Sequence, residues 1–277
     1  MHYPEFFSQE EVERRERHYR AFCANASAVC VQAEWTKQDL IRHFALESSK
    51  ITVIPWGSIL DAQKKPEEPE IDATVKKYNL SRPCFVYPAA TWPHKNHQLI
   101  LHALSILKRA YRLEPQILFT GSTRNHKEKL ESLALELGVH KQVRYLGFLE
   151  ERELQAVYLI SVALIFPSRF EGFGLPILEA FEAGLPVVSS NATTLPEVAG
   201  GAAMYFDPDA PDELASHMKS ILENHSLREK MAEQGKMALS RFSMQETARR
   251  FQSLYDRIAK RSCQLASGNQ NALGDKK

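Results

Sequence analysis

From residue 84 onward, short runs of apolar residues alternate with amphipathic segments along the chain. The runs are rich in Val, Ile, Phe and Tyr, which favour strands. They predict strands at 84–90, 116–121, 143–147, 163–168, 186–190 and 203–207. In the segments between them, apolar residues recur at helical spacing, as Ile100, Leu104 and Leu107 do. The pattern therefore predicts alternating strands and helices.

The predicted helices connect the strands in chain order. They cover a segment that begins at about Lys95, then 125–137, 151–160 and a segment ending near residue 184, followed by two helices within 211–241. A last helix is predicted over 243–260, opened by a capping box of Ser243 and Glu246. Strands that are apolar along their whole length are typical of a parallel sheet with helices on both faces. Because such crossovers are right-handed, we expect an α/β fold with a doubly wound, Rossmann-like parallel sheet.

The two ends of the chain differ from this pattern. Before residue 58 the sequence predicts two short strands, at 28–34 and 51–57, with a helix over 36–44 between them. This block is too short for a complete Rossmann unit. A charged, proline-rich stretch at 61–70 is expected to link it to the main domain, and the polar residues at the C-terminus, 263–277, predict a disordered tail.

The composition is that of an ordinary globular protein. The chain has 277 residues, of which 44% are hydrophobic and 25% charged. With 35 basic against 34 acidic residues, its formal net charge of +1 does not favour nucleic acid as a partner, so any anion site must be local. Four widely spaced cysteines without a C-x-x-C pair indicate free thiols in a reducing compartment rather than a zinc site or disulfides.

The chain carries no pattern of a targeting signal or a membrane span. Its first residues, MHYPEFFSQEEVERRER, are highly charged and have no apolar core, which argues against a secretory signal. The longest apolar stretch, around 156–167, is too short to cross a bilayer. We therefore expect a cytoplasmic protein.

The loop EGFGLP, residues 171–176, carries the strongest chemical signal. It follows a predicted buried strand and opens a helix, at the sheet edge where open α/β folds bind their ligands. Gly174 permits a sharp turn, and the amides of Gly174 and Leu175 at the helix N-terminus would cradle a diphosphate. Glu171 in the loop and Glu179, one turn into the helix, are suited to accept hydrogen bonds from sugar hydroxyls. Alternatively, the glycines only form a turn and the glutamates are charges near a helix N-terminus.

Two further residues follow the ends of other predicted strands. Lys95 lies in TWPHKNH, where its cation would balance a diphosphate through charge-assisted hydrogen bonds of roughly 1.5–3 kcal/mol each. Alternatively, a lysine at a helix start is a solvated surface group, and the neighbouring His94 and His97 are interpreted as surface or structural residues. Gly121 ends the next strand, where it either lets a ligand approach the main chain or forms a turn.

Taken in order, the segments TWPHKNH, VRYLGFL, IFPSRFEGFGLPILEAFEAGLPVVSS and LPEVAGGAAMYFDP resemble the C-terminal domain of the family-4 retaining glycosyltransferases of GT-B fold. The resemblance runs from about residue 51 to 258. Its most specific part is the spacing of Glu171 and Glu179, with seven residues between them. It implies transfer of a sugar from a nucleoside-diphosphate donor to an acceptor, with retention of the anomeric configuration and without a metal or other cofactor.

The resemblance also assigns roles to the residues of the site. Glu171 would contact the donor sugar near the reacting carbon, and Glu179 would hold the ribose. The diphosphate would be bound by the Lys95 cation and by the main-chain amides of Phe173, Gly174 and Leu175. The base would lie against residues 146–149, which include Phe148, and Gly121 completes the predicted donor site. Glu171 and Lys95 would be the catalytic residues, with the leaving diphosphate stabilised and its oxygen accepting the acceptor's proton.

The chain departs from this family at two places. Members carry an arginine six residues before the lysine, where this chain has Ala89, and Arg169 or Arg124 is the candidate substitute. The second departure is the front, which resembles only the tail of the acceptor domain. We therefore expect a remnant of that domain, a nucleotide-sugar domain and a C-terminal helix, at 1–57, 58–242 and 243–262.

Because most of the acceptor domain is missing, we expect a truncated or split enzyme that is inactive alone. Its acceptor would be a glycan or a lipid-linked sugar, and any contact with a membrane surface would come through the missing domain or a partner chain. Mannose is assigned as the donor sugar by similarity alone. The alternative is a non-catalytic remnant or subunit that binds a nucleotide sugar. A sugar-nucleotide epimerase matches EGFGLP less well, and a phosphorylase requires a much longer chain.

One further pattern concerns metals. Asp207-Pro208-Asp209 matches the Asp-x-Asp of metal-dependent glycosyltransferases. Because it follows a predicted strand and precedes Pro211-Asp212-Glu213, a turn and a helix cap explain it better, and no metal site is predicted.

Overall fold

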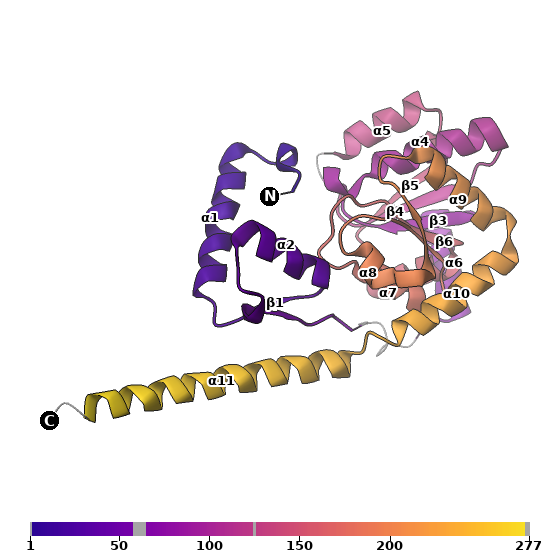
Figure 1. Cartoon of the computed structure of the whole chain (residues 1–277). Coiled ribbons are helices and arrows are strands. Elements are labelled where there is room, and N and C mark those ends of the chain that lie inside the picture. Colours follow the sequence, from indigo (N-terminus) through magenta and orange to yellow (C-terminus); the bar gives the residue numbers. More distant parts are fainter. Residues whose placement is uncertain (1, 58–64, 124–125, 275–277) are drawn as a thin grey trace. The chain divides into compact units, whose positions relative to one another are not determined.

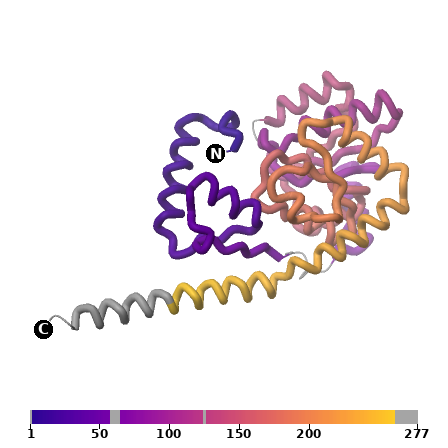
Figure 2. The backbone as a smooth tube through the Cα atoms, viewed as in Figure 1, coloured from indigo at the N-terminus to yellow at the C-terminus, as the bar shows by residue number. Residues whose placement is uncertain are grey.

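The computed structural model describes residues 2–57, 65–123 and 126–274, with side chains as far as Lys260. The chain divides into two compact units (Figure 1). His2–Phe6 and Ser58–Arg241 form the larger one, called here the sheet unit. Phe7–Gly57 and Phe242–Lys277 form the smaller one, called the helical unit. Figure 2 traces the backbone through both units in the same colours.

Within the described residues, the sheet unit contains a six-stranded parallel sheet of order β5-β4-β3-β6-β7-β8. The strands are β3 Cys84–Pro88, β4 Gln116–Thr120, β5 Val143–Gly147, β6 Ala163–Phe166, β7 Val187–Ser190 and β8 Ala203–Phe206. Every residue of β4, β6 and β7 is buried, as expected of strands covered on both faces. The chain winds outward in opposite directions from β3 and from β6, so the prediction of a doubly wound sheet is confirmed.

Helices cover both faces of this sheet. They are α3 Glu68–Tyr78, α4 His97–Ile106, α5 Lys127–Glu136, α6 Glu151–Ile160, α7 Leu175–Glu182, α8 Leu195–Ala199, α9 Pro211–Glu223 and α10 His225–Leu239. Short turns of 3₁₀-helix are η1 Pro4–Phe6, η4 Pro93–Lys95, η6 His140–Gln142 and η7 Gly200–Ala202, and a π-helical turn, η5 Leu107–Tyr111, extends α4. α4 packs against α5 and α9, whereas α3 packs against α6 and α7 against α10. Figure 1 shows the first group on one side of the strands and α6, α7 and α10 on the other.

The stretch 61–70 is predicted as a linker, and this prediction is wrong for its last three residues, which belong to a helix. Residues 61–64 lie outside the described residues, but α3 begins within the remainder. Pro69 sits in the first turn of α3, where its missing N–H costs no helical hydrogen bond. Glu67 and Glu70 form a reciprocal capping box. The proline and the acidic residues therefore start a helix.

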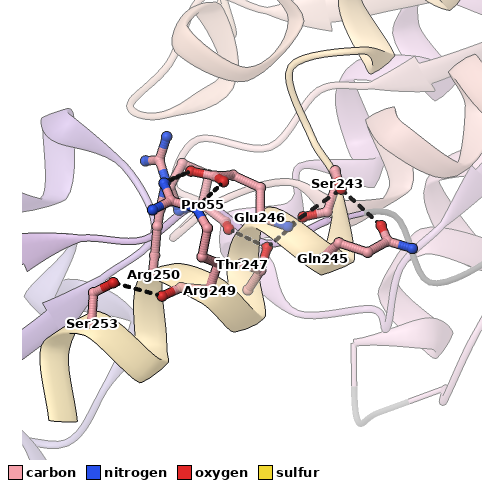
Figure 3. Close-up of polar contacts among 8 residues, drawn as sticks. All are labelled: Pro55, Ser243, Gln245, Glu246, Thr247, Arg249, Arg250 and Ser253. Carbon is pink, nitrogen blue, oxygen red and sulfur yellow. Dashed lines mark hydrogen bonds and ion pairs between the residues drawn. The ribbon is translucent and has the colours of Figure 1, made fainter. Parts of the chain in front are cut away.

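The helical unit contains α1 Gln9–Asn25, β1 Val29–Val31, α2 Glu34–Phe44, η2 Ser48–Lys50, β2 Ile51–Val53 and α11 Met244–Gly274. β1 and β2 pair in parallel as a two-stranded sheet, close to the predicted strands. Polar contacts fasten the start of α11 to the end of this block. The Thr247 hydroxyl donates to the carbonyl of Pro55 at 2.8 Å (Figure 3), and Arg257 donates to the hydroxyl of Thr52 at 2.9 Å.

The start of α11 differs in detail from its prediction. The Glu246 amide donates to the Ser243 hydroxyl at 3.4 Å, which is one half of the predicted capping box. The Glu246 carboxylate instead pairs with Arg249 and Arg250, both at 2.7 Å (Figure 3), and these hydrogen bonds lower the pKa of Glu246 to about 2. The helical backbone continues to Gly274, beyond the end predicted near residue 260 and into the stretch predicted as disordered, because no proline interrupts it.

Among the described residues, none of the helices is at once long enough and apolar enough to reach across a bilayer.

Replacing Gly235 by alanine tests the packing of α10 on α7. A Cβ atom at Gly235 would lie 2.5 Å from Cδ1 of Phe181, whose side chain is buried and has little room to move. In an exposed helix this change stabilises by about 0.5–1 kcal/mol, but here we expect a loss of about 1–3 kcal/mol. The measurement is urea unfolding. Gly201→Ala, where nothing lies within 4 Å of the added Cβ, is the matched control, and equal midpoints for the two variants would contradict the packing.

Candidate functional site

The candidate site lies where the sheet reverses its winding. β3 and β6 are neighbours, and the chain continues from β3 toward one edge of the sheet and from β6 toward the other. In open α/β folds the loops at the carboxyl ends of such strands diverge and leave a crevice for a ligand. Lys95 follows β3 in η4, and Glu171 follows β6 in the loop before α7. The fold therefore carries both predicted residues to this edge.

Lys95 and Glu171 meet directly. Nζ of Lys95 lies 2.5 Å from Oε1 of Glu171, and their side chains are only 19% and 12% exposed. An ion pair with so little contact with water is less screened than a surface pair, so it holds its geometry. The cation and the carboxylate predicted to act on one substrate are thus neighbours, although 76 residues separate them in the chain.

A buried tyrosine holds the two loops in place. The Tyr87 side chain on β3 is fully buried, and its hydroxyl donates to the carbonyl of Lys95 at 2.8 Å. The same oxygen lies 2.8 Å from the Ser168 hydroxyl, which must donate because the tyrosine proton is already used. Ser190 on β7 in turn donates to the carbonyl of Ser168 at 2.6 Å. Burial, together with the nearby Glu171 charge, raises the pKa of Tyr87 well above its usual value, so the hydroxyl stays protonated.

The Glu171 loop is also fixed from the α8 side. The Glu171 amide donates to the Thr193 hydroxyl at 3.1 Å, and the buried Thr194 hydroxyl donates to the carbonyls of Glu171 and Phe173, at 3.2 and 3.1 Å. Gly174 then caps α7 with a φ of 103°, a conformation that favours glycine. A Cβ there would also lie 2.9 Å from Cδ2 of Leu195. The turn into α7 therefore requires a glycine at this position.

Glu179 lies one turn into α7 and has a partner of its own. The Tyr158 hydroxyl on α6 donates to Oε2 of Glu179 at 2.7 Å. Tyr158 is 1% exposed, and Glu179 is half-buried. Burial raises the pKa of Glu179, while the hydrogen bond from Tyr158 opposes that rise. The structure thus brings Glu171 and Lys95 together, and it places Glu179 on α7, the helix that follows the Glu171 loop, against α6.

Gly121 and Ala89 lie side by side at the ends of β4 and β3. Gly121 has a φ of 99°, and a Cβ on it would lie 3.1 Å from the carbonyl carbon of Ala89. The Gly121 amide donates to the carbonyl of Gly147 at 2.6 Å. This close approach of three strand ends restricts the position to glycine and is compatible with both interpretations of Gly121. A role for Gly121 in donor binding stays a prediction.

Phe173 and Phe148 occupy opposite environments. The Phe173 ring is 5% exposed and belongs to the core, so the group that it can offer a ligand is its main chain. The Phe148 ring follows β5 and is 87% exposed. Leu175 is the first residue of α7, where its amide belongs to the unpaired end of the helix. Their binding roles stay predictions.

Arg169, a candidate to replace the arginine at the position of Ala89, has a carboxylate partner, and its substitution for that arginine stays a prediction. Its guanidinium pairs with Asp209 at 2.5 Å, and its amide donates to the carbonyl of His94 at 2.8 Å. Arg124, the other candidate, lies outside the described residues. The Asp209 amide donates to Oδ1 of Asp207 at 2.8 Å, so the Asp-x-Asp segment forms a turn whose second carboxylate is paired with Arg169.

The two histidines beside Lys95 differ in burial. His97 is 2% exposed and packs between the rings of Tyr87 and Phe119, with ring centroids 4.7 and 4.9 Å away. This burial lowers the pKa of His97 to about 3, so the ring is neutral and structural. Burial, with the adjacent Lys95 charge, also lowers the pKa of His94.

Several residues that hold the site were not found by sequence reasoning. The sequence pattern places Tyr87 and Tyr158 at strand and helix positions and Ser168 at the end of a predicted strand, and it assigns no role to Thr193 or Thr194. Their hydroxyls act on groups far away in the chain, such as Tyr158 on Glu179, 21 residues later. The available signal was the tyrosine itself, since a buried hydroxyl needs a partner where phenylalanine needs none.

Comparison with known proteins assigns the family. A family model described as "Glycosyl transferases group 1" matches residues 70–238. The chain belongs to the group 1 glycosyltransferases. It is 29% identical over 243 residues to an O-antigen chain mannosyltransferase B of Escherichia coli, covering 87% of this chain and 63% of that protein. It is also 28% identical over 255 residues to the serotype-specific mannosyltransferase WbdA of E. coli, covering 90% of this chain and 31% of that protein. The chain thus spans less than two thirds of these relatives.

Solved glycosyltransferase structures share the fold. The structure of a glycosyltransferase from Rickettsia africae matches with a TM-score of 0.77 and 21% identity, over 88% of this chain and 67% of that one. Anabaena Alr3699/HepE, solved in complex with UDP and glucose, matches with a TM-score of 0.79 and 19% identity, over 92% of this chain and 69% of that one. The predicted family and the predicted fold are therefore confirmed.

The buried His97 predicts a pH-dependent stability. Its pKa is near 6.5 in the unfolded chain and about 3 in the folded one, so between these values the unfolded state binds the extra proton. Stability is therefore lost as the pH falls below about 6.5, by about 2 kcal/mol from this group at pH 5. In His97→Leu we expect the fall in the urea midpoint between pH 7 and pH 5 to shrink accordingly. His102→Leu, at an exposed position of the same helix, is the control, and identical pH profiles for the two variants would contradict the assignment.

Proposed function

We propose that this chain is the donor-binding part of a retaining glycosyltransferase that transfers a hexose from a nucleoside-diphosphate sugar. The observation that carries the proposal is the Lys95–Glu171 pair at the reversal point of the sheet, beside the N-terminus of α7. A sugar diphosphate presents an anionic group next to a set of hydroxyls. This pair offers a cation next to a carboxylate, which matches that ligand in charge and in hydrogen-bonding character.

The diphosphate would bind to Lys95 and to the amides at the start of α7. The first N–H groups of a helix have no intrahelical partner and carry part of the positive end of the helix dipole. Gly174 supplies the tight entry that brings the main chain close to a ligand. Because Ala89 takes the place of an arginine and Arg169 is paired with Asp209, Lys95 carries much of the positive charge at this position. The diphosphate would thus give Lys95 a second anionic partner besides Glu171.

The chemistry would follow from this placement. The bond between the anomeric carbon and the diphosphate oxygen breaks, and negative charge builds up on the leaving group. Lys95 and the α7 amides would stabilise that charge, which is how preorganised donors accelerate a reaction. The acceptor oxygen bonds to the same face of the carbon and passes its proton to the diphosphate oxygen. Glu171 would orient the sugar through its hydroxyls, and Glu179 would accept hydrogen bonds from the ribose.

The donor sugar and the acceptor are proposed from the relatives. Mannose is supported by the names of the E. coli relatives, both described as mannosyltransferases. The O-antigen relative supports a glycan or lipid-linked sugar as the acceptor. A UDP complex in a structural neighbour supports a nucleotide-sugar donor. The reaction would take place in the cytoplasm, and any contact with a membrane surface would come through an acceptor domain or a partner chain.

A non-catalytic role is the second candidate. The chain spans 63% of the mannosyltransferase B relative and 31% of WbdA, so the activity of those whole proteins is a proposal for this chain. In the non-catalytic role the chain holds a nucleotide sugar and a partner supplies the acceptor. Calorimetry with GDP-mannose and UDP-glucose, followed by a donor-hydrolysis assay, separates the two. Binding with hydrolysis supports the transferase, and binding without hydrolysis supports the partner-dependent role.

Two alanine variants test the division of roles between the glutamates. We expect Glu179→Ala to weaken nucleoside-diphosphate binding about tenfold, because one set of charge-assisted hydrogen bonds is lost. We expect Glu171→Ala to lower turnover of the donor about 100-fold while the affinity for the nucleoside diphosphate changes by less than about threefold. Titration calorimetry and the hydrolysis rate give the two quantities.

The control for both variants is Glu233→Ala, which removes an exposed carboxylate from α10. It should change neither binding nor turnover. If all three variants behaved alike, the proposed donor site would be wrong, and absence of nucleotide binding to the unaltered chain would refute the function itself.

A further inference from the structure

Tyr158 and Glu179 form a contact that the proposed reaction does not use. The tyrosine comes from α6 and the glutamate from α7, and the hydroxyl donates to Oε2 of the carboxylate at 2.7 Å. Tyr158 is 1% exposed, so its hydroxyl is shielded from water. A phenylalanine would fill the same space without placing a polar group in the core. Packing alone therefore does not explain why this position carries a tyrosine hydroxyl.

This contact divides the two oxygens of Glu179 between two tasks. Oε2 accepts the tyrosine proton, which fixes the rotation of the carboxylate about its last bond. In the proposed donor site, Oε1 would then be the oxygen that accepts from a ligand hydroxyl. A carboxylate held by one buried donor presents its other oxygen in a constant direction, so less conformational freedom is lost when a ligand binds.

The same contact acts on the charge of Glu179. Burial raises the pKa of this carboxyl, and the Glu151 and Glu182 charges raise it further. The hydrogen bond from Tyr158 works against them, because it is made to the ionised form. Without the hydroxyl, the pKa of Glu179 would be higher still. Tyr158 itself stays protonated, because burial and the Glu179 charge raise its pKa well above the usual value.

We propose that Tyr158 is a positioning residue for ribose recognition, acting through Glu179 without touching the nucleotide. This inference rests on the proposed function, in which Glu179 holds the ribose. The inference goes further, because it assigns to Tyr158, on a different helix from Glu179, a part in selecting a ribose over a sugar without hydroxyls. A purely structural tyrosine would affect stability but would not affect this selection.

The test compares two ligands on the complete chain. The affinity of GDP or UDP, whichever binds the unaltered protein, is measured beside that of its 2′,3′-dideoxy analogue. The unaltered chain is expected to prefer the ribonucleotide by about tenfold. In Tyr158→Phe we expect ribonucleotide binding to weaken about fivefold while the dideoxy analogue stays within about twofold, so the preference largely disappears. As the pH is lowered, ribonucleotide binding should also begin to weaken at a higher pH in this variant than in the unaltered chain, because the pKa of Glu179 is higher without the hydroxyl.

Two further variants separate positioning from folding. Tyr205→Phe removes another partly buried tyrosine hydroxyl, one that donates to the carbonyl of Gly200, and it should leave the preference unchanged. Glu179→Gln alone and combined with Tyr158→Phe should give ribonucleotide affinities within about twofold of each other, because the hydroxyl acts only through the carboxylate. Independent, additive losses would contradict this.

The outcomes distinguish the inference from the proposed function. If the unaltered chain binds neither nucleotide, the proposed function fails and the inference with it. If the unaltered chain prefers the ribonucleotide and Tyr158→Phe keeps that preference, the inference is overturned while the proposed function stands. A parallel loss of affinity for both ligands in Tyr158→Phe would show a structural role and would also overturn it.

Discussion

The site depends on the buried hydroxyl of Tyr87. β3 and β6 end side by side, but their connections leave in opposite directions, and nothing in the sheet ladder itself fixes the loops that follow. The hydroxyl bonds to the main chain at Lys95 and to the side chain of Ser168, which lies three residues before Glu171. The hydrogen bonds of Tyr87 therefore hold the two loops that carry Lys95 and Glu171, independently of the ion pair between these residues. Under the proposed function, both charges would be in place before the donor binds.

Much of the fold was accessible from the sequence, because apolar runs and helical spacing are properties of single segments. The six strands of the sheet unit were predicted within a few residues, and the family was identified from the EGFGLP segment and its neighbours. Lys95 and Glu171 were also predicted, since both follow strands that end at the same edge of a parallel sheet. The misreading of α3 had a local cause: Pro69 and its acidic neighbours occur equally in linkers and in first helical turns.

The remainder of the site was not accessible, because it depends on which segments lie opposite each other. Tyr158 falls in an apolar helix pattern, and only the packing of α6 beside α7 shows that its hydroxyl faces Glu179. Arg169 is a similar case: the sequence suggests it as a replacement cation, and only the structure shows that its guanidinium pairs with Asp209. The exposure of a side chain also depends on tertiary packing: the Phe148 ring is 87% exposed, whereas the Phe173 ring is 5% exposed.

The start of α11 is held against the end of the N-terminal block within the helical unit. Gly57 lies against the main chain of Ser243 and Met244, with no room for a Cβ, and the Thr247–Pro55 hydrogen bond joins the same two segments. In the sequence, residues 58–241 are therefore an insertion between two segments that pack on each other. A side chain at residue 57 would force these two segments apart and destabilise the helical unit without altering any residue of the sheet.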